Sequence, residues 1–105
     1  MAVPPDLRGE RRRDLLRLLE QERLDGLIVT HLPNVRYLTG FSGTSGVAVV
    51  LRDATIFLSD FRYRGQAETE VGDTARIEIV SADLWARLWE VLRGNRQAGV
   101  LGYES

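Results

Sequence analysis

The first part of the chain has leucines at helical spacing, which predicts an amphipathic helix. Four of the five leucines in the first 20 residues recur near helical spacing, and we expect Asp6 to cap the start of the helix that carries them. The leucines expected on its apolar face are Leu7, Leu15, Leu18 and Leu19. The arginines expected on its solvated face are Arg8, Arg11, Arg12, Arg13 and Arg17.

Short apolar runs and a proline locate the next elements. The run GLIVT at 26–30 is typical of a buried strand. The proline in LPNVRYL at 32–38 suits the first turn of a short helix. Residues 46–60 predict two strands that are joined by a tight turn at 52–54.

The second half of the chain continues this alternation. Residues 61–71 favour a helix capped by Asp60, and residues 75–80 alternate between apolar and polar like a half-exposed strand. Residues 83–93 predict a helix that ends at a Gly-Asn pair, and residues 98–104 predict another strand. Helices that alternate with short strands indicate an α/β domain, and the hairpin makes its small sheet mixed.

Two tryptophans share one face of the helix expected at 83–93. Trp85 and Trp89 are four residues apart, and Leu84, Leu88 and Leu92 already supply a core stripe. One tryptophan at the edge of the helix could therefore face a partner. Packing of both rings in the core is the favoured interpretation.

Composition narrows the class of protein. A chain of 105 residues with 44% apolar and 28% charged residues fits one globular domain. The absence of cysteine excludes disulfides and thiolate metal sites, and agrees with a reducing cytosol. No apolar run reaches the roughly 20 residues that span a bilayer, so we expect no membrane association. A net charge of −1, with acids among the arginines, gives no reason to expect nucleic-acid binding.

The stretch NVRYLTGFSGTSG at 34–46 carries three glycines, at every third position. It could be a phosphate cradle, a catalytic loop or a bend between two elements. The spacing G-x-x-G-x-x-G precedes a strand rather than a helix, and the chain has no lysine, so neither dinucleotide nor P-loop binding is expected.

The stretch at 34–46 lacks the general base that a catalytic serine would need. Ser42 and Ser45 would need one, and the only histidine, His31, is interpreted as a polar residue at a strand end. The acidic residues are dispersed, so no metal site is expected. Asp60 with Arg62 is interpreted as a helix cap with a local ion pair. The glycine stretch is therefore expected to be a bend that needs positive φ angles.

Three motifs together resemble the N-terminal domain of the creatinase, prolidase and Xaa-Pro aminopeptidase group of metallopeptidases, over about residues 8–104. They are NVRYLTGF at 34–41, SGTSG at 42–46 and D-x-R-Y at 60–63. The resemblance implies a small mixed β-sheet flanked by helices, with a ribonuclease H-like motif. It also implies that residues 1–105 form a single domain that lacks its last elements and the whole C-terminal "pita-bread" catalytic domain.

The resemblance also sets the expected chemistry. In that family two divalent metal ions (Mn, Co or Zn) are held by two Asp, one His and two Glu of the catalytic domain, and those motifs are not found here. We therefore expect no cofactor, catalytic residue or metal ligand in this chain, and no peptide hydrolysis by the isolated chain. The parent protein is expected to be a cytoplasmic, homodimeric Xaa-Pro peptidase that acts on short peptides.

By the same resemblance, the domain shapes substrate access to the catalytic domain and contributes to dimerisation. The residues implied to form a substrate-proximal loop are Phe41, Ser42, Gly43, Thr44 and Ser45. The residues interpreted as structural are Asn34, Arg36, Tyr37, Asp60, Arg62 and Tyr63. Asn34 is expected to satisfy free backbone donors near a helix start, and Tyr37 to offer surface area and one hydrogen bond.

Two other classes remain open from the sequence. One is a stand-alone interaction or dimerisation module without chemistry. The other is a small-ligand binder of flavodoxin-like type, with its ligand at the C-terminal ends of the strands. The parent's choice among Xaa-Pro dipeptides, longer Xaa-Pro peptides and creatine-like amides is also open.

Overall fold

The computed structural model describes residues 5–95 and 99–104, and the side chains from residue 7 onward. The described residues form four α-helices, five β-strands and two 3-10 turns. The helices are α1 Pro5–Gln21, α2 Leu32–Thr39, α3 Arg64–Glu70 and α4 Leu84–Arg93. The strands are β1 Gly26–Val29, β2 Val47–Leu51, β3 Thr55–Asp60, β4 Arg76–Val80 and β5 Leu101–Tyr103. The 3-10 turns, η1 Phe61–Tyr63 and η2 Gly72–Thr74, flank α3, and the predicted order of helices and strands is confirmed.

The strands form one mixed sheet in the order β4-β3-β2-β1-β5. Strand β2 pairs antiparallel with β1 and β3, whereas the outer pairs, β3 with β4 and β1 with β5, are parallel. The Leu51 amide donates to the Ala54 carbonyl at 2.8 Å and closes the predicted hairpin turn. Strand β2 is apolar along its whole length because both of its faces are buried.

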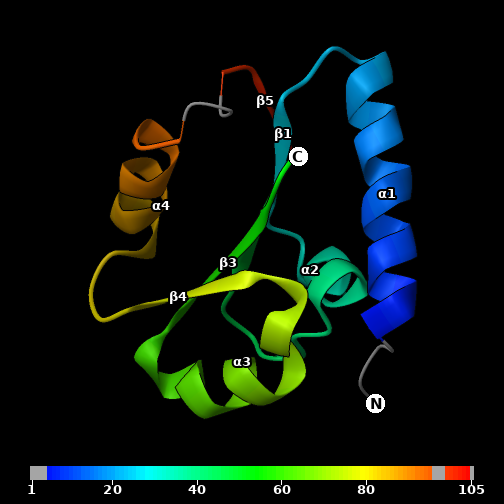
Figure 1. The fold of residues 1–105 in the computed structure, drawn as a ribbon. Helices are drawn as coiled ribbons and strands as arrows, with labels where there is room; N and C mark the ends of the chain where they lie inside the picture. Colours follow the sequence, from blue (N-terminus) through cyan, green and yellow to red (C-terminus); the bar gives the residue numbers. More distant parts are fainter. Residues whose placement is uncertain (1–4, 96–98, 105) are drawn as a thin grey trace.

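The helices cover the two faces of the sheet unequally, with α4 on one side and α1 and α2 on the other (Figure 1). Alternate strand residues point to opposite faces, so each face has its own apolar core. The buried core on the side of α1, α2 and α3 comprises Val29, Val35, Leu38, Phe41, Ala48, Val50, Phe57, Ala67 and Val71. The core under α4 comprises Ile28, Val47, Val49, Leu51, Ile56, Leu58, Leu88 and Leu92.

The start of α1 differs from the prediction. The helix begins at Pro5, so Asp6 lies inside its first turn rather than at the capping position. Proline is favoured there because the first helical amides have no partner within the helix. The predicted cap at Asp6 is therefore wrong.

The inner face of α1 also differs from the prediction, because its stripe begins with arginines. The residues of α1 that are buried or half-buried at helical spacing are Arg8, Arg12, Leu15, Leu16 and Leu19. In contrast, Leu7 and Leu18 are 40% and 57% exposed. Arg8, Arg12, Leu15 and Leu19 are separated by four, three and four residues, a spacing that keeps them on one face of a helix. This face packs inward, although two of its members are arginines and two of the predicted leucines lie elsewhere. The solvated face predicted for Arg8, Arg11 and Arg12 is corrected, because Arg8 is buried and Arg11 and Arg12 are half-buried.

Helix α4 packs through the predicted leucine stripe. Leu88 and Leu92 are buried, and the Asp83 carboxylate caps the helix by accepting from the amides of Trp85 and Ala86. The side chains of Trp85 and Trp89 are 41% and 47% exposed, so the expectation that both pack in the core is wrong. The leucines fill the stripe that faces the sheet and leave the rings at its margin.

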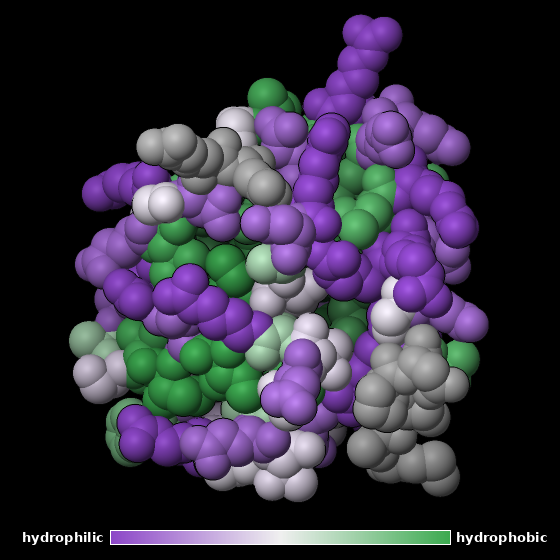
Figure 2. Space-filling view, in the orientation of Figure 1, coloured by the Kyte–Doolittle hydropathy of each residue, from purple (hydrophilic) through white to green (hydrophobic). Residues whose placement is uncertain are grey.

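The surface is mostly polar. Figure 2 shows one face on which hydrophilic side chains are interrupted by separate apolar patches, mainly on the left-hand side. Strand β5 is shorter than the predicted 98–104, and residue 98 lies outside the described residues. In the part of the chain that the structure describes, no helix has the length and apolarity needed to cross a membrane.

Candidate functional site: the loop between α2 and β2

The loop that follows α2 begins with a left-handed residue. Gly40 has φ 85° and its amide donates to the Arg36 carbonyl at 2.8 Å, which ends the helix. A Cβ at this position would lie 2.2 Å from Nη2 of Arg8. Glycine is required here for both its backbone angle and its small size. The predicted positive φ is confirmed at this one glycine of the loop.

The other two glycines are needed for close packing rather than for φ. A Cβ on Gly43 would lie 2.3 Å from Cζ of Phe41, and a Cβ on Gly46 would lie 2.8 Å from Cε1 of Phe57. The Phe41 ring is buried between Phe57 and Tyr63, with centroid distances of 4.6 and 5.5 Å. The aromatic rings therefore form a fixed floor on which the loop lies.

A carboxylate from α3 holds the loop from the side. Glu70 accepts from the Ser42 amide at 2.9 Å with one oxygen and from the Ser42 hydroxyl at 2.7 Å with the other. Gln66 donates to both partners, at 3.1 Å to the Ser42 hydroxyl and 3.0 Å to Glu70. Burial opposes the charged form of Glu70, but these hydrogen bonds outweigh it and lower its pKa. Sequence reasoning missed Glu70, which lies 28 residues from Ser42 in the chain.

Two further bonds fix the end of the loop. The hydroxyls of Thr44 and Tyr63 are hydrogen-bonded to each other, and the Ser59 hydroxyl donates to the Ser45 carbonyl. Ser42 and Thr44 are exposed, whereas Gly43 and Ser45 are half-buried. The structure thus brings the predicted loop residues together on a fixed support, with the Phe41 side chain beneath them.

The D-x-R-Y motif forms a cap with an ion pair, as predicted. Asp60 accepts from the Arg62 amide at 3.0 Å and from its Nε and Nη2 at 2.8 Å each. The hydrogen bonds from the Arg62 side chain lower the pKa of Asp60 to about 2. What Asp60 caps is η1, the short turn that places Tyr63 beside the loop.

The opposite end of α2 is held by another distant carboxylate. Glu104 accepts from the amides of Thr30 and His31 at 2.9 and 2.5 Å, and from the Asn34 side chain at 2.5 Å. Glu104 is therefore the acceptor for these backbone donors, and Asn34 is a donor to Glu104, contrary to the role predicted for it. These bonds lower the pKa of Glu104 against the opposing effect of its burial.

The remaining motif residues on α2 face outward. Tyr37 is 51% exposed, and the Arg11 guanidinium lies 3.9 Å from its ring centroid and donates to its carbonyl at 2.8 Å. Arg36 is exposed on the same helix. These contacts join α1 to α2.

The groups of the loop form structural hydrogen bonds rather than a catalytic arrangement. The Ser42 hydroxyl is bonded to a carboxylate with a lowered pKa, which is a weak base, while His31 lies at the other end of α2. Within residues 5–95 and 99–104, no three histidine, aspartate or glutamate side chains converge as a metal site requires. The described residues therefore do not fit the family's metal ions, and no reaction step is assigned to them.

The fold and the site define a small mixed-sheet α/β domain with an anchored, exposed glycine loop. The chain belongs to the Creatinase/Prolidase N-terminal domain family, which it matches over residues 11–105. It is 46% identical over 57 residues to the uncharacterized peptidase YqhT of Bacillus subtilis (strain 168). These 57 residues are 54% of this chain and 16% of that protein.

Solved structures agree with this assignment. The chain is similar to the Xaa-Pro dipeptidase from Bacillus anthracis, with TM-score 0.78 and 26% identity over 92% of this chain and 27% of that one. It is also similar to the N-terminal domain of the cytoplasmic peptidase PepQ from Mycobacterium tuberculosis H37Rv, with TM-score 0.75 and 33% identity over 90% of this chain and 72% of that one. The chain thus spans a minor part of the two full-length relatives and most of a solved N-terminal domain.

Proposed function

We propose that this chain is the non-catalytic N-terminal domain of a metal-dependent Xaa-Pro peptidase of the prolidase or aminopeptidase P type. Its family and the Xaa-Pro dipeptidase similarity support this class. In this proposal the two divalent metal ions and their ligands belong to a C-terminal catalytic domain. We place the peptidase in the cytoplasm, as the name of the PepQ relative states for that protein.

We further propose that the domain narrows access to the catalytic site. The observation that carries this step is the anchored loop, in which Ser42 and Thr44 are exposed although the backbone is fixed by Glu70 and the aromatic floor. A fixed loop presents hydroxyl and backbone groups to the polar ends of a peptide without an ordering cost on binding. Ser42, Gly43, Thr44 and Ser45 form the rim, and Phe41 supports it from below.

The test uses the full-length peptidase, found by reading the gene beyond the codon for Ser105. We expect an open frame that encodes the Asp, Asp, His, Glu and Glu ligand set. In the purified enzyme, Thr44→Trp should lower kcat/KM for Xaa-Pro tripeptides more than for dipeptides. The control is Asp53→Trp, in the exposed β2–β3 turn. Equal effects on both substrates, or no effect, would contradict the rim assignment.

A second candidate is a dimerisation module. It is favoured by the two half-exposed tryptophans on α4, a residue type enriched at protein interfaces. Sedimentation equilibrium of the chain tests it, with Trp85→Ser/Trp89→Ser as the variant. A homodimer that the double variant abolishes would support the module, and a monomer at all concentrations would contradict it. A stop codon after Ser105 would favour this function over the first.

A further inference from the structure

The side chain of Arg8 lies against the first residue of the rim loop, residues 40–46. A Cβ added to Gly40 would lie 2.2 Å from Nη2 of Arg8, 2.6 Å from its Cζ and 3.0 Å from its Nε. The guanidinium group therefore packs on the backbone of Gly40, the residue at which α2 ends and the loop begins. Glycine leaves the space for this contact, because the side chain of any other residue would occupy it.

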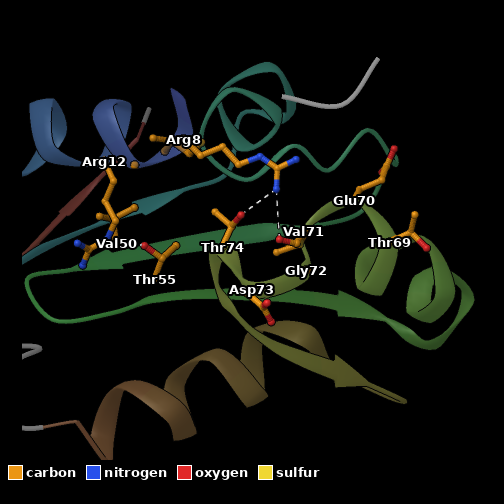
Figure 3. Close-up of a pocket in the computed structure, with 12 residues that line it drawn as sticks. Arg8, Arg12, Val50, Thr55, Thr69, Glu70, Val71, Gly72, Asp73 and Thr74 are labelled. Carbon is orange, nitrogen blue, oxygen red and sulfur yellow. Dashed lines mark hydrogen bonds between the residues drawn. The ribbon is translucent and has the colours of Figure 1, made fainter. Parts of the chain in front are cut away.

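The same guanidinium group also holds the segment that follows Glu70. Its Nη1 donates to the Val71 carbonyl at 3.2 Å and to the Thr74 hydroxyl at 2.8 Å (Figure 3). Val71 is the residue next to Glu70, whose carboxylate accepts from the amide and hydroxyl of Ser42. Arg8 thus contacts the start of the rim loop and also the end of the helix that carries the carboxylate bonded to that loop.

The burial of Arg8 is unfavourable for its charge. The residue is 5% exposed, its Nε is buried with no hydrogen-bond partner, and burial lowers its pKa. Among the described side chains, no carboxylate forms an ion pair with Arg8. Apolar side chains of similar volume are often at least as stabilising as buried charged groups. Stability alone is therefore a weak reason for an arginine here, whereas a rigid planar group with directed donors suits the positioning of its neighbours.

Arg12, the next arginine on the inner face of α1, provides a contrast. Its Nε donates to the Thr55 hydroxyl at 2.9 Å, and its Nη2 donates to the carbonyls of Leu51 and Arg52 at 2.6 and 3.1 Å. These acceptors belong to the β2–β3 turn and the strand ends beside it, away from the rim loop. Arg12 is therefore a matched control for Arg8, since it is an inward-facing arginine of the same helix that bonds to a different segment.

We propose that Arg8 is the positioning residue of the rim loop. One planar group contacts both Gly40 and the end of α3, so it fixes the separation of these two segments and keeps Ser42 within reach of Glu70. This inference rests on the proposed function for what the loop does, which is to limit substrate access. The positioning itself is a property of the 105-residue chain and is tested on that chain.

The test is hydrogen exchange at the Ser42 amide in Arg8→Ala. We expect the protection of this amide to fall by about tenfold or more, because the loop opens more often without the guanidinium contact. Arg12→Ala should leave the Ser42 amide at its wild-type protection, although it also removes an inward-facing arginine. Unchanged protection in Arg8→Ala would overturn the proposal. An equal loss in Arg8→Ala and Arg12→Ala would also overturn it, because such a loss would reflect a general loss of stability.

Arg8→Lys keeps the proposal testable if Arg8→Ala does not fold. Lysine retains the charge but has no planar group to lie against Gly40. We therefore expect Arg8→Lys to lower the protection of the Ser42 amide as well, by a smaller factor than Arg8→Ala. Wild-type protection of Ser42 in Arg8→Lys would overturn the role assigned to the guanidinium group.

Kinetics of the full-length peptidase separate this inference from the proposed function. Arg8→Ala should raise kcat/KM for Xaa-Pro tripeptides relative to dipeptides, mainly through KM, because a loosened rim admits the longer substrate. Arg12→Ala should leave this ratio unchanged. Lost Ser42 protection with an unchanged ratio in Arg8→Ala would support the positioning role and contradict the substrate rim. Wild-type Ser42 protection would contradict the positioning role whatever the ratio.

Discussion

The two ends of α2 are each held by a carboxylate from a distant part of the chain. Glu104, which follows β5, accepts from the amides of Thr30 and His31 before the helix. Glu70, on α3, accepts from the amide and hydroxyl of Ser42 after the helix. In both cases hydrogen bonds to the charged form lower the pKa of the carboxylate although burial opposes this.

The two ends differ in what else supports them. The loop after α2 also lies on the buried rings of Phe41 and Phe57 and is bonded through Thr44 to Tyr63. At the end before α2, Glu104 makes the side-chain bonds that hold Thr30, His31 and Asn34. The same arrangement, a distant carboxylate that accepts hydrogen bonds from backbone amides, therefore has two different results. After α2 it acts together with the aromatic rings and fixes an exposed loop. Before α2 it joins the chain that follows β1 to the chain that follows β5.

The largest expected effect comes from Gly40, at the junction between α2 and the loop. Gly40→Ala should destabilise the domain by about 2–4 kcal/mol, because it combines a left-handed backbone with a clash against Arg8. The matched control is Gly65→Ala in α3, where a Cβ meets nothing within 4 Å and alanine favours the helix. Urea unfolding measures both variants, and equal stabilities would refute the steric argument.

Removing the two carboxylates separates the two ends. Glu104→Ala and Glu70→Ala should each cost about 1–3 kcal/mol through lost charge-assisted bonds, with Glu104→Ala the larger loss. The reason is that the aromatic floor still supports the loop when Glu70 is absent. Glu68→Ala, at an exposed position of α3, serves as the control and should stay near wild type. Thermal unfolding checks the order, and a larger loss for Glu70→Ala would reverse the comparison.

Acid should weaken both ends together. The pKa values of Glu70 and Glu104 are lower in the folded state than the unfolded value of about 4.3. Their stabilising contribution is therefore complete above that pH and is lost as the pH falls through the lower, folded-state values. Unfolding free energies measured from pH 6 to pH 3 should fall less steeply in Glu70→Ala and Glu104→Ala than in wild type. If the unfolding free energies of the wild type and the two variants fell in parallel with pH, the protonation of neither Glu70 nor Glu104 would be linked to folding.

The smallest expected effect concerns the support of the loop from η1. Asp60→Ala should cost about 0.5–2 kcal/mol, because it removes the cap and an exposed ion pair. With the pKa of Asp60 at about 2 in the folded state and about 3.9 in the unfolded state, most of this loss should persist at pH 4 and it should diminish as the pH falls from there to about 2. An unchanged melting temperature at pH 7 would exclude the capping role.

Much of the fold was predictable because local patterns determine it. The apolar run at 47–51 and the turn at 52–54 locate the central hairpin. Asp60 caps the 3-10 turn η1 and Asp83 caps helix α4, as aspartates at these positions commonly do. The family resemblance located the loop after α2 through its glycines. These features depend on neighbouring residues, which sequence patterns describe well.

The parts that sequence reasoning missed depend on residues far apart in the chain. Glu104 is 73 residues from His31, and Arg8 is 66 residues from Thr74, so no local spacing relates them. The leucine pattern of α1 was right for Leu15 and Leu19 but wrong for Leu7 and Leu18, which are exposed. Arg8 and Arg12 occupy the first part of the inner stripe. The exposure of Trp85 and Trp89 likewise depends on which face of α4 packs against the sheet.

The most direct test of the anchored loop is hydrogen exchange at the Ser42 amide. Ser42 is exposed, so its amide would exchange quickly unless the bond to Glu70 persists in solution. We expect a protected Ser42 amide in the wild-type chain, loss of that protection in Glu70→Ala, and unchanged protection at this position in Glu104→Ala. Rapid exchange of the Ser42 amide in the wild-type chain would contradict a fixed loop and, with it, the proposed substrate rim.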